Sequence, residues 1–319
     1  MSALAFTETS VPVPELTNPL GYGPAIAHEG RDVSRVLFTI ETRAAVVRLA
    51  YLETTTRRVF VGPRVLGDLR AACLSRDGQH LWILCSFGLY RGNAVNLTLS
   101  PRIKVPKYMH DLVPFAAGTA IAISQPQRTR TPVVLESSAE KTITITAPTP
   151  NIGLDSGETS WLLSFWAGEA REFDRVMKPT GKRRGLPRGV GARRRGGDVY
   201  FVAAVRRQHP GVSPEHPAPW VVPEDEVCVF SLAEWRILRS RRIAALHGTI
   251  GIDARGRVLL AAGGKLTDRP TVMVVIDPES LEVLGTHEFR ERPEGISLAG
   301  PAAVAYRLRA PRINLVEWS

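Results

Sequence analysis

Short apolar segments recur along the chain and are separated by turn residues. Residues 247–289 show the pattern most clearly: HGTIGID, the turn ARG, RVLLAAGG, a loop, TVMVVID, the turn PESLE and VLGTHEF. These segments alternate in polarity and are rich in β-branched residues, which is typical of strands. No stretch keeps the apolar spacing of a helix beyond one or two turns, so the pattern predicts an all-β protein.

A turn followed by an apolar strand repeats about every 40 residues. The marker turns are Asp77-Gly78, Gly118, Gly157, Gly197, Gly256 and Gly300, with successive spacings of 40, 39, 40, 59 and 44. A relative without glycine, Thr42-Arg43, extends the series upstream to seven turns. The long spacing contains a proline-rich and charged insertion at 208–226. A period of this length indicates a repeat architecture.

Four strands per unit and seven units predict a seven-bladed β-propeller, with six blades as the alternative. Although 319 residues would suffice for two domains, neither a linker nor a change in composition divides the chain, so we expect a single domain, 1–319. The last unit lacks an outer strand. We expect the β-rich segment 1–14 to supply it and close the ring, because an open ring would leave exposed edges.

Three segments resemble known propeller families. Residues 274–285, VVIDPESLEVLG, resemble the third strand, turn and fourth strand of YVTN and lactonase-type propellers. Residues 186–201 resemble the inner-strand signature of virginiamycin B lyase and NHL-repeat propellers, and residues 75–78 resemble their inner hairpin. The resemblance implies a propeller fold, which many functions share.

The net charge of +10 is concentrated in one segment. Residues 178–195 hold eight basic residues and no acid, which leaves 33 basic against 31 acidic residues elsewhere. We expect a solvated loop there, or a contact with an anionic ligand. Because no aromatic residue interrupts the segment, nucleic acid is an unlikely partner.

Cysteine use and the N-terminus favour the cytoplasm. The three cysteines have neither disulfide-like nor zinc-like spacing, and the first residues have no basic and apolar signal pattern. No apolar stretch predicts a membrane partner. Arginine outnumbers lysine 35 to 6, which suggests a GC-rich bacterial source.

Polar residues lie where the inner strands of a propeller would begin. This face, here named the entry face, surrounds the mouth of the central channel and commonly holds the sites of propellers. Alignment of the repeats places there His28, Asp32, Asp68, His110, Asn151, Arg188, His247 and Glu294. The insertion should project over the same face as a lid or a partner-binding flap, and Trp220 is also a candidate wall residue of the pocket. The residues of this lid or flap would be His209, His216, Trp220, Glu224, Asp225 and Glu226.

Several functions fit such a ring. We favour an enzyme in which His110, His247 and Glu294 perform acid–base catalysis, because a histidine pKa suits proton transfer near neutral pH. The reaction would be of lyase, cyclase, isomerase or hydrolase type on a small polar or anionic substrate bound by Arg188, Asn151, Asp68, His28, Asp32 and Trp220. A bacterial specialised-metabolite pathway would suit it.

Two alternatives remain open. No cofactor is predicted, but the same His110, His247 and Glu294 are possible ligands of a divalent metal, an arrangement that resembles virginiamycin B lyase and senescence-marker-type lactonases. The other alternative is a non-catalytic propeller that binds a small molecule or a protein partner. The absence of GxxxxGK[ST], HExxH and GxSxG motifs disfavours nucleotide hydrolysis, zincin chemistry and α/β-hydrolase catalysis.

Overall fold

The computed structural model consists of strands, turns and loops. It describes residues 4–13, 35–42, 46–53, 55–65, 69–74, 79–93, 96–105, 109–115, 119–124, 133–136, 142–144, 152–155, 158–165, 167–203, 224–244, 246–253, 255–262, 271–290, 293, 295–299, 302–306 and 312–319. These residues form 26 strands and no helix, so no helix in them could cross a membrane.

The strands of the described residues form seven sheets, numbered here in chain order. Sheet 1 contains β2 (Arg35–Thr42), β3 (Val46–Glu53) and β4 (Arg58–Val65). Sheet 2 contains β5 (Leu69–Leu74), β6 (His80–Cys85) and β7 (Gly88–Asn93). Sheet 3 contains β8 (Met109–Pro114), β9 (Thr119–Ser124), β10 (Val133–Glu136) and β11 (Thr142–Thr144). Sheet 4 contains β12 (Ile152–Asp155), β13 (Ser160–Ser164), β14 (Glu169–Phe173) and β15 (Pro179–Gly185).

The last three sheets follow the same plan. Sheet 5 contains β16 (Val190–Arg195), β17 (Asp198–Ala203), β18 (Glu224–Ser231) and β19 (Arg236–Ala244). Sheet 6 contains β20 (Leu246–Ile252), β21 (Val258–Ala262), β22 (Val272–Ile276) and β23 (Val283–Glu288). Sheet 7 contains β24 (Gly295–Ala299), β25 (Ala302–Tyr306) and β26 (Arg312–Trp318), and β1 (Phe6–Pro12) pairs antiparallel with β26.

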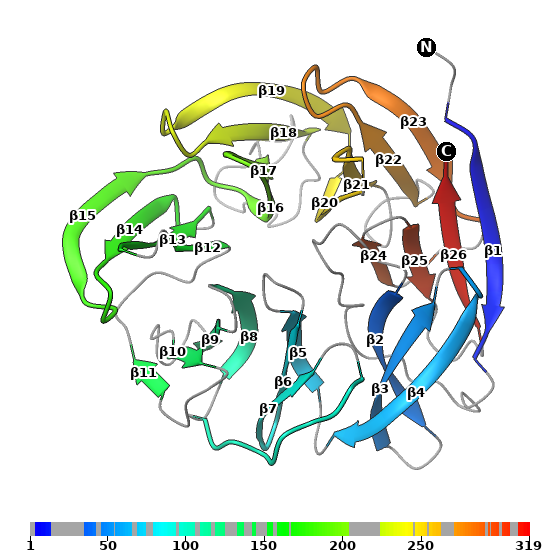
Figure 1. Cartoon of the computed structure of the whole chain (residues 1–319). Coiled ribbons are helices and arrows are strands. Elements are labelled where there is room, and N and C mark those ends of the chain that lie inside the picture. The colour runs from blue at the N-terminus through cyan, green and yellow to red at the C-terminus, as the bar shows by residue number, and fades with distance from the viewer. Residues whose placement is uncertain are drawn as a thin grey trace, which may run out of the picture.

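The sheets are arranged as in a β-propeller. Figure 1 shows them around a common axis. In sheets 1 to 6 the first strand in chain order lies nearest the centre and the last lies at the periphery, whereas in sheet 7 β24 lies nearest the centre and β1 at the periphery. Neighbouring strands within each sheet are antiparallel. The all-β prediction is therefore confirmed at the level of a propeller fold.

The second strand β6 is apolar on both faces because its sheet packs against a neighbour on either side. In β6, Leu81 and Ile83 pack with Leu49 of sheet 1, whereas Trp82 and Leu84 pack with Met109 of sheet 3. Burial on both sides explains the unbroken apolar run LWILC, which would otherwise alternate.

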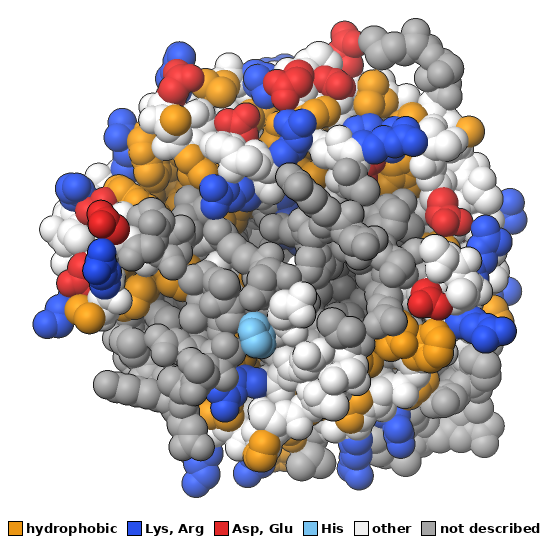
Figure 2. Space-filling view, in the orientation of Figure 1, with side chains coloured by type: hydrophobic (Ala, Val, Ile, Leu, Met, Phe, Trp, Pro, Cys, Tyr) orange, Lys and Arg blue, Asp and Glu red, His pale blue; other side chains and the backbone are white. Residues whose placement is uncertain are grey.

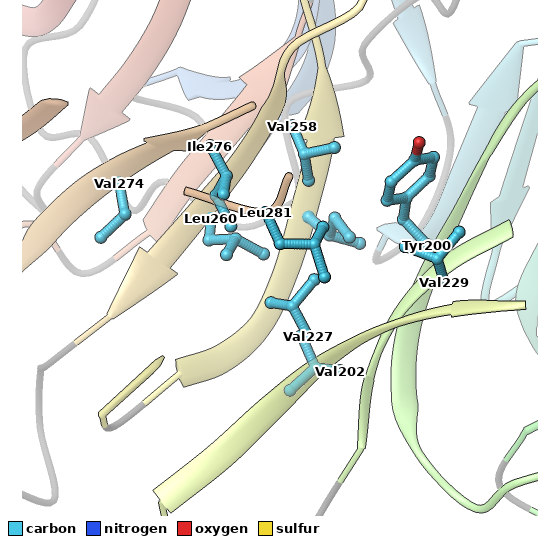
Figure 3. Close-up of a cluster of buried hydrophobic side chains, with 10 residues drawn as sticks. Tyr200, Val202, Val227, Val229, Val258, Leu260, Val274, Ile276 and Leu281 are labelled. Atoms are coloured by element: carbon cyan, nitrogen blue, oxygen red, sulfur yellow. The ribbon is translucent and has the colours of Figure 1, made fainter. Parts of the chain in front are cut away.

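The same packing joins sheets 5 and 6. Figure 3 shows their cluster, in which Tyr200 and Val229 of sheet 5 lie with Val258, Leu260 and Ile276 of sheet 6. All five side chains are almost inaccessible to solvent. Burial of such side chains contributes about 1.5–3 kcal/mol each, so contacts between sheets are a main source of stability.

Aspartates organise three hairpins between strands. Asp174, Asp253 and Asp277 each accept hydrogen bonds at Oδ1 from two backbone N–H groups within the following four residues. Hydrogen bonds from Ser280 lower the pKa of Asp277 below its ordinary value. Short polar side chains of this kind fix tight turns by replacing backbone partners.

The repeat analysis predicted the second strands correctly. The seven marker turns directly precede β3, β6, β9, β13, β17, β21 and β25. The insertion lies between the second and third strands of sheet 5, as expected, but Glu224, Asp225 and Glu226 belong to β18 and not to a lid. Their place in a lid was wrong because β18 extends further toward the insertion than its charged sequence suggested.

The loop predicted for residues 178–195 is also wrong. Four of its basic residues lie in or beside the outer strand β15, Arg193, Arg194 and Arg195 lie in the inner strand β16, and Arg188 lies in the short connection between these strands. All seven residues of β15 are exposed, so this strand has no alternating apolar pattern to reveal it. The backbone hydrogen bonds to β14, and not side-chain burial, define it as a strand.

Candidate functional site at the inner-strand entries

The strand order defines the entry face in the structure. The turn between β13 and β14 and the loop between β15 and β16 lie together there, because the amide of Leu186 donates to Gly168 O at 2.9 Å and the amide of Gly189 donates to Phe165 O at 2.9 Å. The inner strands begin at this face. It is the face on which the sequence predicted the site.

Four inner strands carry a β-bulge close to this face. In β5, β8 and β16 a single residue is skipped in the pairing with the second strand, respectively Arg70, His110 and Gly191. In β20 the three residues from His247 to Thr249 face only Ala261. A bulge leaves its extra residue outside the ladder and turns its side chain, and bulges are common beside active sites.

Both predicted catalytic histidines therefore fall in bulges at equivalent places in sheets 3 and 6. The side chains of His110 and His247 lie outside the described part of the structure. Asp68, Asn151 and Glu294 also lie outside it, although each directly precedes an inner strand in the sequence. His28, Asp32, His209, His216 and Trp220 lie outside the described residues as well.

Arg188 is the predicted site residue whose side chain the structure describes. It is exposed in the loop before β16, and its aliphatic stem lies against Gly168, where an added Cβ would be 3.3 Å from Arg188 Cγ. Among the described residues it has no carboxylate partner. Its positive charge is thus available to an anion at the entry face.

Arg70 is a polar residue of this face that the sequence analysis missed. It is exposed at the bulge of β5, and its Nη1 donates a hydrogen bond to Met109 O at 3.1 Å. Met109 directly precedes His110, and Arg70 lies 40 residues before His110, which is one repeat. The repeat period was therefore a signal that could have identified it.

Phe87 is a second residue that the sequence analysis missed. It lies in the turn between β6 and β7, on the entry face, and its side chain is 66% exposed. An aromatic ring exposed to this extent adds apolar surface to the entry face, where the other candidate site residues are polar or charged.

Several other basic side chains around the described rim are paired or stacked. Lys182 and Arg183 of β15 lie near Glu172 and Glu169, and Arg195 pairs with Glu279 at 3.0 Å. Arg184 lies over the ring of Trp235, 5.4 Å from its centroid. Figure 2 shows the same mixture of basic and acidic side chains around the periphery. The cluster is therefore divided among several local contacts and does not form one positive surface.

The described tryptophans and two of the cysteines contribute to the core and not to the entry face. Trp82 is 1% exposed, and Trp161 and Trp235 pack against each other beside the cluster of sheets 4 and 5. Cys73 and Cys85 are buried cysteines on neighbouring strands and do not form a disulfide. Within the described residues no group of three or more His, Cys, Asp or Glu side chains could hold a metal, but the predicted trio His110, His247 and Glu294 is not among the side chains searched.

The class of protein that this geometry defines is a β-propeller with polar residues at the entries of its inner strands. Among solved structures, hydrazine synthase of Kuenenia stuttgartiensis is similar, with a TM-score of 0.60 and 12% sequence identity over 93% of this chain and 96% of that one. Since 1121 solved chains match, the likeness shows a widely shared fold and not a reaction. The sequence matches no family model, and no curated protein matches it in sequence.

Proposed function

We propose that the protein binds a small polar or anionic organic molecule at the entry face and transforms it by acid–base chemistry of His110 and His247. The observation that carries this proposal is the position of both histidines in bulges of inner strands. A bulge places a side chain outside the regular ladder, and imidazole can both accept and donate a proton near neutral pH.

The reaction class follows from these groups. Two histidines, with Glu294 at the entry of β24, suit a lyase, cyclase, isomerase or hydrolase, each of which moves a proton during bond breaking or formation. Arg188 supplies positive charge toward the substrate, and Asp68, Asn151, His28, Asp32 and Trp220 complete the proposed binding set. In a metal-dependent variant of this mechanism, His110, His247 and Glu294 would hold a divalent metal as a cofactor.

The proposed function requires a closed ring of seven blades, and we include this architecture in the proposal. The seven sheets are the seven blades of one ring, and β1 closes it as the outer strand of sheet 7. Support comes from the pairing of β1 with β26 and from the packing of Val11 and Val13 with Ala50 and Leu52 of sheet 1. A closed ring fixes the inner strands around one axis, which a convergent site needs.

Nucleic acid and membranes are not the proposed partners, and the cytoplasm is the proposed compartment. Binding along a phosphate backbone needs several unpaired cations on one surface. The carboxylates of Glu169, Glu172 and Glu279 lie beside the cations of β15 and β16 instead. A small molecule of a bacterial specialised pathway remains the proposed substrate.

A non-catalytic interaction propeller is the second candidate. Phe87 favours it, because an exposed aromatic side chain on a turn is a common anchor for a protein partner. Under this alternative, loss of the histidines leaves binding intact, whereas Phe87→Ala weakens capture of the partner.

The test compares two histidine variants with a matched control. His110→Gln and His247→Gln are incubated with a protein-free metabolite extract, and mass spectrometry follows which compounds change. Conversion should fall at least about 100-fold in both, because general acid–base catalysis contributes 10²–10⁴-fold. His80→Gln, at the start of the second strand β6 on the opposite face, should retain conversion.

The outcomes separate the candidates. If the wild type changes no compound, or both variants convert it at the wild-type rate, the catalytic proposal is wrong. Proteins prepared without chelator are analysed for divalent metals in the same experiment. A stoichiometric metal that both histidine variants lose supports the metal-dependent variant.

A further inference from the structure

We propose that Arg70 binds a carboxylate or phosphate group of the ligand and holds the ligand beside His110. This inference rests on the proposed function, and it adds the chemical class of the substrate and the residue that selects it. Neither the positive charge of Arg70 nor its position in the repeat is sufficient to assign it this role. It depends on the contact that Arg70 makes with the neighbouring sheet.

The bulge explains why the Arg70 side chain is not part of the regular sheet. Leu69 pairs with Cys85 and Ala71 with Leu84, so Arg70 has no residue opposite it. Further along the same strand, Ala71 and Cys73 are buried in the apolar cluster that contains Trp82. Arg70 remains exposed instead. A bulged residue at the end of an inner strand is a position from which a side chain can leave the blade.

The hydrogen bond of Arg70 places its guanidinium at the junction of sheets 2 and 3. Nη1 lies 3.1 Å from Met109 O, and this bond joins the inner strands β5 and β8, which are neighbours. Met109 O belongs to the residue before His110, and His110 is itself the bulged residue of β8. The positive group therefore lies next to the backbone that carries the proposed acid–base residue.

The guanidinium keeps most of its donors for a ligand. Arginine has five N–H donors, and the bond to Met109 O uses one of them. No carboxylate of the described residues pairs with Arg70. By contrast, the partly buried Arg257 donates from Nε to Asp253 at 2.7 Å, and Arg239 lies near Asp198 and Glu279. Arg70 thus differs from the arginines that have a structural carboxylate partner.

These properties define the ligand as an organic anion. A guanidinium binds carboxylate and phosphate groups through two parallel hydrogen bonds, which a neutral amide cannot match. One end of the ligand would be fixed at the seam of sheets 2 and 3, and its reacting bond would lie toward His110. Such fixing of orientation is what a positioned charge contributes to catalysis.

The experiment measures the binding of two anionic probes, malonate and inorganic phosphate, by isothermal titration calorimetry. Salt is kept at about 0.15 M so that diffuse electrostatic attraction is screened. Wild-type protein should bind at least one probe, and malonamide, the neutral analogue of malonate, should not bind. Arg70→Gln should weaken the binding at least ten-fold, and Arg70→Lys should restore part of it.

Arg241→Gln is the matched control, because Arg241 is an exposed arginine of the outer strand β19 without a carboxylate partner in the described residues. It removes the same charge from the outer strand of sheet 5, at the periphery of the propeller, and should leave probe binding unchanged. The thermal midpoint of each ligand-free variant is also measured. A purely structural Arg70 would lower this midpoint without changing the affinity for the probes.

The inference is wrong if the wild type binds neither probe, if Arg70→Gln binds as the wild type does, or if Arg241→Gln weakens binding equally. Its failure is distinguishable from that of the proposed function. Loss of conversion in the histidine variants with normal anion binding in Arg70→Gln removes the inference alone. Loss of anion binding in Arg70→Gln with normal conversion in the histidine variants removes the catalytic proposal alone.

Discussion

At the scale of single residues, the environment of a side chain decides whether its chemistry is available. Cys228 of β18 is 1% exposed, and burial raises the pKa of its thiol from 9.0 to about 12, with a smaller contribution from the charge of Glu226. Arg70 and Phe87 are exposed at strand entries and turns of the entry face. The thiol of Cys228 is thus shielded from solvent and stays protonated at neutral pH, whereas the side chains of Arg70 and Phe87 are accessible at the entry face.

The raised pKa of Cys228 predicts a loss of stability at alkaline pH. Between pH 9.0 and about 12 the unfolded chain releases the thiol proton while the folded protein retains it, so the free energy of unfolding should fall as the pH rises. Below pH 9.0 this contribution is fully present. Urea unfolding at pH 8, 9, 10 and 11 measures the slope, which Cys228→Ala should reduce.

Val229→Ala is the control for this slope, because it removes a buried side chain of the same strand that cannot titrate and leaves Cys228 in place. It should lower stability at every pH and retain the wild-type alkaline slope. An equal slope in the wild type and in Cys228→Ala would show that other groups cause the alkaline loss.

At the scale of elements, the loops of the entry face are held by close backbone contacts. Gly189, just before the inner strand β16, donates its N–H to Phe165 O. A Cβ at this position would lie 2.5 Å from Val202 O and 2.6 Å from Phe201 Cδ2. Since Val202 O belongs to the backbone of the neighbouring strand, it has little freedom to move away.

Gly189→Ala is therefore expected to destabilise the protein by about 2 kcal/mol, the usual cost of forcing extra atoms into a packed site. Urea unfolding measures the change. Gly185→Ala is the matched control, because a Cβ there has no atom within 4 Å, and its effect should stay within about 0.5 kcal/mol. Equal stabilities of the two variants would contradict the steric argument.

The sequence predicted the elements whose signal is local. A turn followed by an apolar run identified the second strands, and β6 shows the physical reason, because it is buried between sheets 1 and 3 and is apolar on both faces. It failed for β15, where Lys182, Arg183 and Arg184 are all exposed and carry no alternation. The bulges at Arg70 and His110 could not be predicted either, because they depend on the register with a second strand.

At the scale of the whole molecule, the termini meet at one sheet. In Figure 1, β1 runs along β26, and their pairing extends from Phe6 opposite Trp318 to Pro12 opposite Arg312. Glu8 adds a side-chain connection to sheet 6. Its carboxylate is 4% exposed and lies 3.1 Å from His287 Nε2, while Asn314 Nδ2 and the amide of Arg290 donate to it at 2.8 and 3.2 Å.

These contacts make the N-terminal strand essential for stability if it closes the ring. Deletion of residues 1–14 should lower the free energy of unfolding by roughly 5 kcal/mol or prevent folding, because the burial of Val11 and of Val13 contributes about 1.5–3 kcal/mol each.

Glu8→Ala tests the same connection in a chain that still folds. It should lower the free energy of unfolding by about 2 kcal/mol, since it leaves three donors without an acceptor. Glu158→Ala, whose carboxylate is 82% exposed in an ion pair with Arg175, is the control and should cost less than about 0.5 kcal/mol. A truncated protein that unfolds at the wild-type urea concentration, or equal effects of the two glutamate variants, would show that β1 is an accessory strand and that the other strands hold the ring together without it.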